Sequence, residues 1–375
     1  MLRPDLAAIP GPMDSTATHR EPSPSGAARP MTQPAGPAPD RTARDFDAEA
    51  VRERLKLKPP RRLPEPVRRL HLALRDSLPD AWVVRRNYFH RFGTYPDLRT
   101  PRRLTEKVTW LKLHGATPLH TLCADKIAVR PWVTERIGAE HLVRAILIAD
   151  TAEALTPEAI PDAGFVVKAT HDTGSVAICT DRARFDWEAC RARMGEALAT
   201  PFWRRQRERH YRDIPPRLIV EELLVPDDPV VGLTDYKLHC FHGEPQWIEC
   251  QIRPPGELYN ATYSLEWERL PWLQLAEIGD SVQYPAELPR PSRLSEMLRI
   301  ARILAAPFPL ARIDLYEVGG RVLFGEMTFT PAAGLERLEY IDPAAGPWRL
   351  DEELGARLDM DRVRTRLAEL RAGKV

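Results

Sequence analysis

Long apolar runs are missing from the sequence, which contains no stretch of about eighteen apolar residues that could cross a bilayer. Its N-terminus also lacks the unbroken apolar core of a secretory signal. The five cysteines form no CxxC pair, which argues against a structural zinc site and fits reduced thiols. We therefore expect a cytoplasmic protein without a transmembrane segment.

A charge imbalance is missing as well, because the formal net charge is only +1. A protein that binds nucleic acid usually carries a strongly basic domain, so no nucleic-acid partner is expected. Lysine is also scarce, and most of the 54 basic residues are arginines. Since an ammonium is a compact point charge, a lysine kept within an apolar strand indicates that such a charge is needed there. Lys168 and Lys237 are in this position.

Composition separates the two ends of the chain from its middle. Residues 1–45 are rich in Pro, Ala, Ser and Thr without a hydrophobic period, which predicts a disordered tail. Residues 46–118 are predicted to be a helical N-terminal region, and 356–375 a C-terminal helix. The arginine-rich segment 52–75 is either a solvated helical face with a linker or a surface for an anionic glycan or membrane.

Hydrophobic periodicity predicts the secondary structure between these ends. Two helices are expected within 81–114, the second capped by Thr105, and another at 124–137 that begins or breaks at Pro131. A short helix after 156–157 and longer ones at 187–211, 293–306 and beyond 350 follow. Strands are expected at 141–149, 165–169, 176–178 and 217–222, with a hairpin over 234–252.

The stretch 312–334, RIDLYEVGGRVLFGEMTFTPAAG, predicts two strands joined at a Gly-Gly pair. Asp314 and Glu326 lie among apolar residues of these strands, where an unpaired carboxylate is costly to bury. A positive partner is therefore expected. It is either a metal ion or metal-bound phosphate, or an arginine such as Arg312 or Arg321.

Register decides whether the two carboxylates can share an ion. An unbulged two-residue turn would place Asp314 opposite Gly325 and point Glu326 to the other side of the sheet. A three-residue loop with a glycine bulge would shift the pairing by one residue. That shift would bring to one face Arg312, Asp314, Phe324, Glu326 and Thr328. We therefore predict an odd-length or bulged hairpin.

Residues 164–178, GFVVKATHDTGSVAI, predict two strands around a small polar loop at 171–175. Backbone N–H groups in such a loop can surround phosphate oxygens, although an ordinary β-hairpin is the simpler interpretation of a loop with one glycine. Lys168 favours the phosphate interpretation. A metal site at His239, Cys240 and His242 is disfavoured, because a strand turns His239 away from the other two.

The order of these features resembles the ATP-grasp superfamily. The segments ADKIAVRPWV, FVVKATHDTGS, PRLIVEELL, DYKLHCFHGEP and RIDLYEVGGRVLFGEMTFTPAAG look like its TupA-like group, which is linked to teichuronopeptide and other surface-polysaccharide biosynthesis. The resemblance covers about 85–355. It implies an α/β (α+β) ATP-grasp fold with nucleotide between two lobes and an antiparallel sheet in the C-terminal lobe. The implied parts are a pre-ATP-grasp segment 119–160, a small lobe 161–224 and a catalytic lobe 225–355.

The resemblance also implies the cofactors ATP and Mg²⁺ and a set of site residues. Phosphate contacts are implied for Lys126, Lys168 and the loop His171, Asp172, Thr173, Gly174 and Ser175, and adenine and ribose contacts for Glu221 or Glu222 with Leu223 and Leu224. Metal ligation is implied for Asp314, Glu326 and Thr328, and phosphate or acyl-phosphate contacts for Lys237, Arg253 and Arg312. Thr328 departs from the family, where an asparagine is usual.

The activity implied is that of a carboxylate–amine ligase, which forms an acyl phosphate and needs no protein nucleophile. Its substrates would be ATP, a carboxylate such as a uronic-acid glycan or polyglutamyl polymer, and an amino acid or other amine. Peripheral association with the envelope biosynthesis machinery is part of this hypothesis. Two alternatives are a nucleotide-sugar glycosyltransferase and a non-catalytic ATP-grasp-like binding module.

Overall fold

The computed structural model describes residues 76–374 except 162, 230, 254–258, 276–281 and 284–285. The described residues belong to one compact unit, Pro59–Val375. The predicted tail 1–45 and the arginine-rich segment 52–75 lie outside the described residues. None of the helices in the described part of the chain is long and apolar enough to span a membrane.

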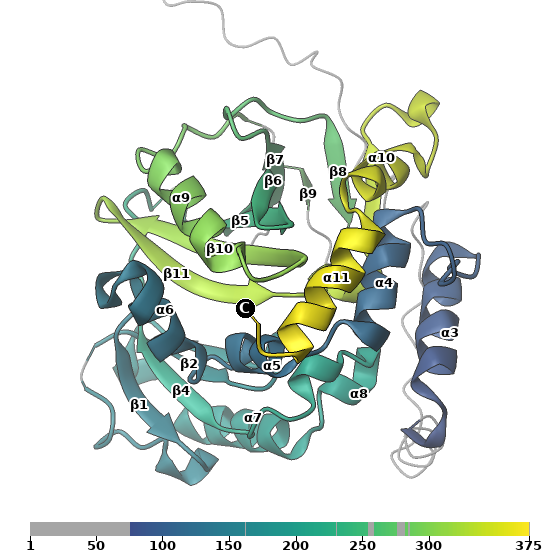
Figure 1. Ribbon diagram of the computed structural model, residues 1–375. Coiled ribbons are helices and arrows are strands. Elements are labelled where there is room, and N and C mark those ends of the chain that lie inside the picture. The colour runs from purple at the N-terminus through teal and green to yellow at the C-terminus, as the bar shows by residue number, and fades with distance from the viewer. Residues whose placement is uncertain are drawn as a thin grey trace, which may run out of the picture. The chain divides into compact units, whose positions relative to one another are not determined.

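A six-stranded sheet forms the larger half of the unit (Figure 1). Its strand order is β11-β10-β5-β6-β7-β9, and all neighbours are antiparallel except β7 and β9. The strands are β5 (Leu233–Phe241), β6 (Glu244–Arg253), β7 (Tyr259–Tyr263), β9 (Val282–Gln283), β10 (Leu310–Val318) and β11 (Arg321–Thr328). The predicted hairpin over 234–252 is β5 and β6, joined at His242-Gly243 with both residues at positive φ.

The two faces of this sheet differ in polarity because side chains alternate along each strand. One face is apolar and is covered by helix α9 (Leu294–Ala305), whose Met297, Ile300 and Leu304 are fully buried. Burial of each such side chain is worth about 1.5–3 kcal/mol. The other face carries a polar residue on nearly every strand, and this face positions the candidate site.

The β10–β11 hairpin has a two-residue turn at Gly319-Gly320 and a bulge further along the ladder. Leu315 pairs with Phe324 but Asp314 pairs with Glu326, so Gly325 is the extra residue. The prediction of a bulged hairpin is confirmed, although the bulge lies in β11 and not in a three-residue loop. Because Phe324 is paired with Leu315 in the apolar core, the prediction that it shares a face with the carboxylates is wrong.

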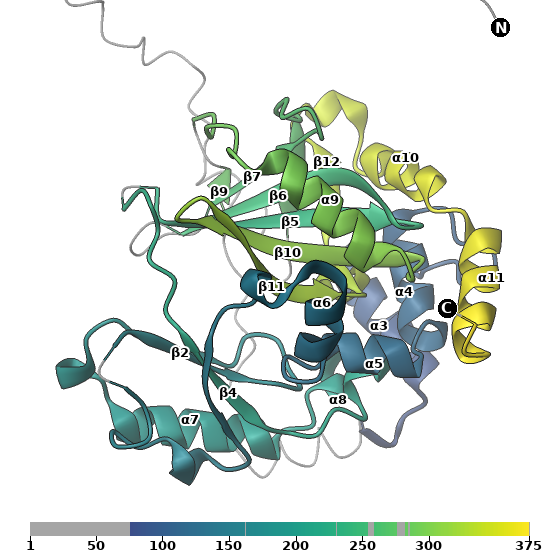
Figure 2. The ribbon, with the colours of Figure 1, turned by 60° about the vertical axis from the view of Figure 1, so that its left-hand side comes forward.

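A four-stranded antiparallel sheet of order β1-β4-β2-β3 forms the second half. Its strands are β1 (Ala145–Ala149), β2 (Phe165–Ala169), β3 (Val176–Cys179) and β4 (Leu218–Glu222). Helix α7 (Trp187–Ala199) lies along this sheet (Figure 2). Its Met194 belongs to the same buried apolar cluster as Phe165 and Val220 of the sheet. The single helix predicted at 187–211 is instead α7, α8 (Trp203–Gln206) and η4 (Arg209–Tyr211). It breaks first at Thr200, which is extended because Pro201 follows it, and again at Arg207, whose left-handed conformation ends α8.

Helices on either side of the sheets complete the described fold. They are α3 (Asp80–Phe92), α4 (Leu104–His114), α5 (Pro118–Ala124), α6 (Val129–Ile137), α10 (Arg349–Arg357) and α11 (Met360–Arg371). Single 3₁₀ turns lie at Ala139–His141, Ala152–Ala154, Arg182–Arg184, Pro331–Gly334 and Pro343–Ala345. A separate two-stranded sheet is formed by β8 (Trp272–Leu275) and β12 (Arg337–Tyr340). The prediction of an α+β fold with an antiparallel sheet in the C-terminal half is confirmed.

Three local predictions differ from the structure. The helix predicted at 124–137 begins only at Val129 and runs through Pro131, which lies in its first turn, where no N–H is required. The segment after 156–157 is a turn, in which Ala159 N–H bonds to the Thr156 carbonyl oxygen. Thr105 is not an N-cap, since α4 begins at Leu104.

Thr105 instead joins α4 to α10. Its N–H and hydroxyl donate to the two oxygens of Asp351, at 2.9 and 2.6 Å, and Asp351 is 1% exposed. Lys107, also on α4, donates to the carbonyl oxygens of Gly355 and Leu358 where α10 ends. The motif RRLTEKVTWLKLHG thus holds the C-terminal helices through buried polar contacts.

We expect Asp351→Asn to change how stability depends on pH. Burial raises the pKa of Asp351 to about 6, against the lowering effect of the Thr105 hydrogen bonds. An unfolded Asp titrates near pH ~4, so between about pH 4 and 6 the folded state binds more protons and the free energy of unfolding falls as pH rises. Asparagine does not titrate, so the variant lacks this pH-dependent contribution to the free energy of unfolding. Urea unfolding should therefore show the variant gaining stability relative to wild type between pH ~4.5 and ~6.5.

Asp361→Asn, on an exposed position of α11, is the matched control and should follow the wild type across this range. A stability difference between Asp351→Asn and wild type that stays constant with pH would contradict the explanation.

Candidate functional site

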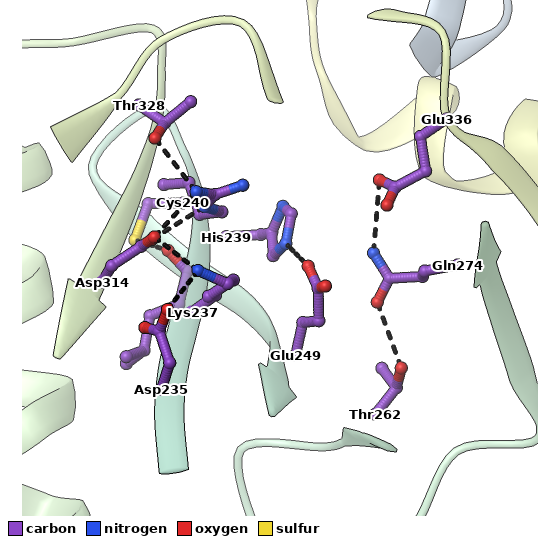
Figure 3. Close-up of polar contacts among 12 residues, drawn as sticks. Asp235, Lys237, His239, Cys240, Glu249, Thr262, Gln274, Asp314, Thr328 and Glu336 are labelled. Atoms are coloured by element: carbon purple, nitrogen blue, oxygen red, sulfur yellow. Dashed lines mark hydrogen bonds and ion pairs between the residues drawn. The ribbon is translucent and has the colours of Figure 1, made fainter. Parts of the chain in front are cut away.

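The polar face of the six-stranded sheet carries charged residues at its centre (Figure 3). The ladder places Thr328 opposite Arg312, Glu326 opposite Asp314, Asp314 opposite Lys237, Lys237 opposite Glu249 and Glu249 opposite Thr262. Paired residues point to the same side of a sheet, so the face is a continuous polar row across five strands. Most of these side chains are nevertheless buried.

Asp314 is the centre of this row, with its side chain 1% exposed. The Arg312 Nε and Nη2 atoms donate to its two oxygens, both at 2.7 Å, and Lys237 Nζ lies 2.8 Å from Oδ2. Burial by itself would raise the pKa of Asp314, but the two cations outweigh it and hold that pKa at about 2. The carboxylate is thus ionised, and its positive partners here are Arg312, as one sequence alternative proposed, and Lys237.

Lys237 also holds Asp235, whose Oδ2 lies 2.5 Å from Nζ. Burial raises the pKa of Asp235 to about 6 despite this contact. Burial opposes the charge of Lys237, yet Asp235 and Asp314 together raise its pKa above the ordinary value. The predicted Lys237 is therefore part of the charge cluster, together with an aspartate that the sequence motifs did not indicate.

The three predicted metal ligands converge on one atom. Arg312 Nη2 lies 2.7 Å from Asp314 Oδ2, 3.3 Å from Glu326 Oε1 and 3.1 Å from Thr328 Oγ1. A cationic nitrogen thus stands where two carboxylates and a hydroxyl meet, and oxygen ligands of this kind suit Mg²⁺. No set of three His, Cys, Asp or Glu side chains in the described part of the chain could hold a metal. The residues therefore fit a cation whose coordination is completed by other oxygens, such as those of phosphates.

The predicted phosphate-binding lysines lie on the other sheet and the segment before it. Lys168 Nζ contacts Glu221 at 2.7 Å, and Glu221 also binds Arg130 at 3.0 Å. Lys126 lies in the turn between α5 and α6, not at the start of a helix, and donates to the Asp172 carbonyl oxygen at 2.6 Å. Burial lowers the pKa of Lys126, whereas the charges of Glu326 and Asp172 act in the opposite direction. Lys126 therefore interacts with both halves of the site.

The loop 171–175 sends only part of its side chains toward this site. His171 Nε2 lies 3.1 Å from the Ala197 carbonyl oxygen at the end of α7, so its ring packs away from the sheet centre. Asp172 Oδ1 is buried and has no hydrogen-bond partner among the described residues. Thr173 lines the cavity described below. Gly174 has a φ of 99°, while the Ser175 carbonyl oxygen accepts from Ala169 N–H and continues the β2–β3 hairpin.

The residues predicted to hold adenine and ribose end β4. Glu221 faces Lys168, whereas the exposed Glu222 turns to Arg144 at 3.1 Å, as expected for neighbours on a strand. Leu223 N–H bonds to the Gly164 carbonyl oxygen, and Leu224 follows it, partly buried. Arg253 ends β6 opposite Leu233, but its side chain lies outside the described part of the structure.

A cavity of about 200 Å³ lies against the predicted metal ligands. Its walls include Thr173 from the loop and Arg312, Glu326 and Thr328 from the large sheet, together with Arg205, Glu208, Tyr211, Thr330, Ala332 and Ala333. The sequence analysis missed this second group. Glu208 and Tyr211 fall in RRQRERHY, a segment whose pattern indicated only a helix, so no local signal marks them.

Two carboxyl groups beside the cluster, Glu249 of the polar row and Glu336 just before β12, have other partners (Figure 3). His239 Nε2 lies 3.1 Å from Glu249, and its ring stacks on Trp247. Gln274 lies 3.1 Å from Thr262 and 3.5 Å from Glu336. Burial, with a contribution from Glu249, raises the pKa of Glu336 to about 8. The binding of His239 to Glu249, away from Cys240 on the apolar face, agrees with the sequence argument against a metal there.

We expect the two predicted metal-binding carboxylates to differ in their effect on stability. Asp314→Asn removes the buried negative charge that Arg312 and Lys237 share and leaves them in contact with only Glu326 and Asp235 among the described carboxylates, which should cost about 3 kcal/mol. Glu326 is 32% exposed and touches Arg312 at 3.3 Å, so Glu326→Gln should cost less than about 1 kcal/mol. Urea unfolding at pH ~7 measures both. Equal losses from the two variants would contradict the assignment of Asp314 as the structural centre.

Comparisons with known proteins place the chain in a family. The family described as TupA-like ATPgrasp matches residues 106–358, and a search of curated proteins finds no match. Similar solved structures include the ATP-grasp ligase PsnB complexed with minimal precursor, at 12% identity over 66% of this chain and 62% of that chain with a TM-score of 0.33. They also include the D-alanine–D-alanine ligase from Helicobacter pylori, at 12% identity over 64% of this chain and 61% of that chain with a TM-score of 0.32. The D-alanine–D-alanine ligase from Bacillus anthracis is similar at 13% identity over 70% of this chain and 74% of that chain, with a TM-score of 0.35. The match thus spans less than two thirds of the PsnB and H. pylori chains. Because the family match covers more than half of the sequence, the protein belongs to the TupA-like ATP-grasp family.

Proposed function

We propose that the protein is an ATP- and Mg²⁺-dependent ligase that joins a carboxylate to an amine through an acyl phosphate. The observation that carries this proposal is the convergence of Asp314, Glu326 and Thr328 on one cationic nitrogen at the wall of a cavity. Thr173 of the phosphate loop lines the same cavity. The family membership supports the same class of reaction.

The lysines would hold the nucleotide phosphates. Lys126 donates to a neutral backbone carbonyl oxygen, which a charged phosphate oxygen could replace. Lys168 is paired with the Glu221 carboxylate, and an ammonium group has further N–H donors that could bind phosphate while this contact remains. Glu221 or Glu222, with the backbone at Leu223 and Leu224, would hold adenine and ribose. The loop His171–Ser175 would supply backbone N–H groups to the phosphates.

Asp314, Glu326 and Thr328 would hold Mg²⁺, which neutralises charge on the β- and γ-phosphates when it is bound. Arg312, which contacts the same three oxygens, would then share its guanidinium N–H groups with phosphate oxygens. Arg312, Lys237 and Arg253 would then stabilise the charge that develops on the transferred phosphoryl group. No side chain needs to act as a nucleophile.

The physiological substrates would be a carboxylate of a uronic-acid or polyglutamyl polymer and an amino acid or other amine. The support for this assignment is the link of the TupA-like group to surface-polysaccharide biosynthesis. We further propose that the reaction takes place in the cytoplasm, in association with the envelope biosynthesis machinery.

Hydroxylamine provides a test that does not require the natural amine, because it attacks acyl phosphates directly and forms hydroxamates. Purified protein with Mg-ATP, hydroxylamine and D-glucuronate, L-glutamate or poly-γ-glutamate should release ADP and hydroxamate in equal amounts. Glu326→Gln should lower both by about 100-fold or more, since it removes a group that stabilises transferring charge. The products can be measured by chromatography and by the colour of the iron–hydroxamate complex.

Glu244→Gln, an exposed position in the β5–β6 hairpin, is the matched control and should retain wild-type rates. Release of AMP with pyrophosphate would contradict the acyl-phosphate mechanism. Calorimetry that detects UDP-sugar binding without ATP binding would favour the glycosyltransferase alternative, and ATP binding without any ADP release would favour the binding module.

A further inference from the structure

Glu208 is a carboxylate in the cavity wall with no role in the reaction described so far. It follows Arg207, whose left-handed conformation ends α8 and turns the chain toward the cavity. Glu208 is only 7% exposed, and its Oε1 accepts a hydrogen bond of 2.6 Å from the Thr330 hydroxyl. Glu208 also lines the cavity, and the side-chain hydrogen bond that its carboxylate makes with a described residue is the one to Oε1. One oxygen thus fixes the side chain, and the other is available to a ligand.

The second acid in this wall is differently placed. Glu326 contacts Arg312 and the Thr328 hydroxyl, and it belongs to the predicted metal ligands. Glu208 has no salt bridge to a described residue. The Tyr211 hydroxyl, also in the wall, stays protonated because burial raises its pKa well above the ordinary value, with Glu208 adding to this effect. Glu208 is therefore the acceptor in this wall that remains for a proton or an ammonium group.

The groups around Glu208 come from several elements. Burial raises its pKa, while the Thr330 hydrogen bond and the charges of Lys112 on α4 and Arg205 on α8 act against this effect. A carboxyl group with a raised pKa is a better proton acceptor at neutral pH than an ordinary glutamate. Across the cavity lie Arg312 and Glu326, next to which the acyl phosphate would form.

We propose that this cavity binds the amine substrate in its ammonium form and that Glu208 accepts the proton the nitrogen loses. The proposal rests on the proposed ligase function and names the amine site within it. A volume of about 200 Å³ and a wall with both acids and arginines suit a small amine that also carries a carboxylate, such as an amino acid.

The proposed step balances as follows in atoms and charge. An ammonium group, RNH₃⁺, transfers one proton to the Glu208 carboxylate and becomes a neutral amine. The nitrogen lone pair attacks the carbonyl carbon of the acyl phosphate, the C–N bond forms, and the C–O bond to phosphate breaks. The second nitrogen proton leaves with the phosphate. The products are the amide, HPO₄²⁻ and a proton on Glu208, which returns to solvent.

The test compares Glu208→Gln with wild type in two reactions that share the acyl phosphate. Glutamine keeps the oxygen that accepts from Thr330 but cannot take a proton. With glycine, L-lysine or ethanolamine as nucleophile, the variant should lose about 100-fold or more in rate. With hydroxylamine, which is uncharged at neutral pH, its rate should stay within about threefold of wild type, since little deprotonation is required.

Glu208→Asp retains a carboxylate and should recover part of the amine reaction, whereas Glu244→Gln should match wild type in both reactions. Equal losses of Glu208→Gln with amines and hydroxylamine would overturn the proposal, because they indicate a structural role. Unchanged rates with amines would overturn it as well.

Binding separates this proposal from the ligase proposal. Glycine, L-lysine and ethanolamine are titrated by calorimetry into wild type and Glu208→Gln, each with and without AMPPNP and Mg²⁺. Binding that is lost in the variant supports the amine site even if no carboxylate is turned over, in which case the ligase proposal alone fails. A wild type that binds AMPPNP but none of the three amines overturns the amine site.

Discussion

The buried contact of Asp314 with Arg312 and Lys237 is the interaction on which the large sheet depends. An isolated carboxylate at this depth would cost several kcal/mol, and so would either cation. Arg312, Asp314 and Lys237 therefore have to be present together. Arg312 and Asp314 lie two residues apart on β10, and the ladder pairs Asp314 with Lys237 of β5. A shift in the register of these strands would therefore also separate the charges that neutralise one another in the site. The same cluster holds Arg312 where it touches Glu326 and Thr328.

This constraint explains why one face of the sheet is polar although it is buried. The opposite face follows the ordinary pattern, with α9 covering apolar side chains. On the polar face, each buried group has to be matched by a partner from a neighbouring strand, as Glu249 is by His239. Such matching fixes the buried side chains of Asp314 and Lys237 before any ligand binds. It thereby limits the reorganisation that phosphoryl transfer would require of this site. The cavity with Glu208 lies where this face meets the segment after α7.

Many of the strands and the charged residues of the site could be predicted, because they follow from patterns of neighbouring residues in the sequence. Alternation marked the strands, the Gly-Gly pair marked the hairpin, and Asp314 and Glu326 were recognisable as charges among apolar residues, of which Asp314 is fully buried and Glu326 is 32% exposed. The existence of a bulge could be predicted, because Asp314 and Glu326 share a face only if the hairpin has one, but its position could not. The position at Gly325 depends on packing against Tyr316 and the Asp314 backbone, since a Cβ there would lie 2.9 Å from the Tyr316 ring. The sequence patterns could not reveal Glu208, which becomes a site residue only through its long-range contact with Thr330.

The position of the Gly325 bulge separates the hairpin into two parts with different tolerance to change. On the turn side, pairing follows from the two-residue connection, and on the far side it follows from the attachment of β10 to β5. The bulge absorbs the one-residue mismatch between these two registers. Without the extra residue, the two-residue turn would pair Asp314 with Gly325 and direct the Glu326 side chain to the apolar face of the sheet. The bulge is therefore what allows a tight turn and a shared polar face to occur in the same hairpin.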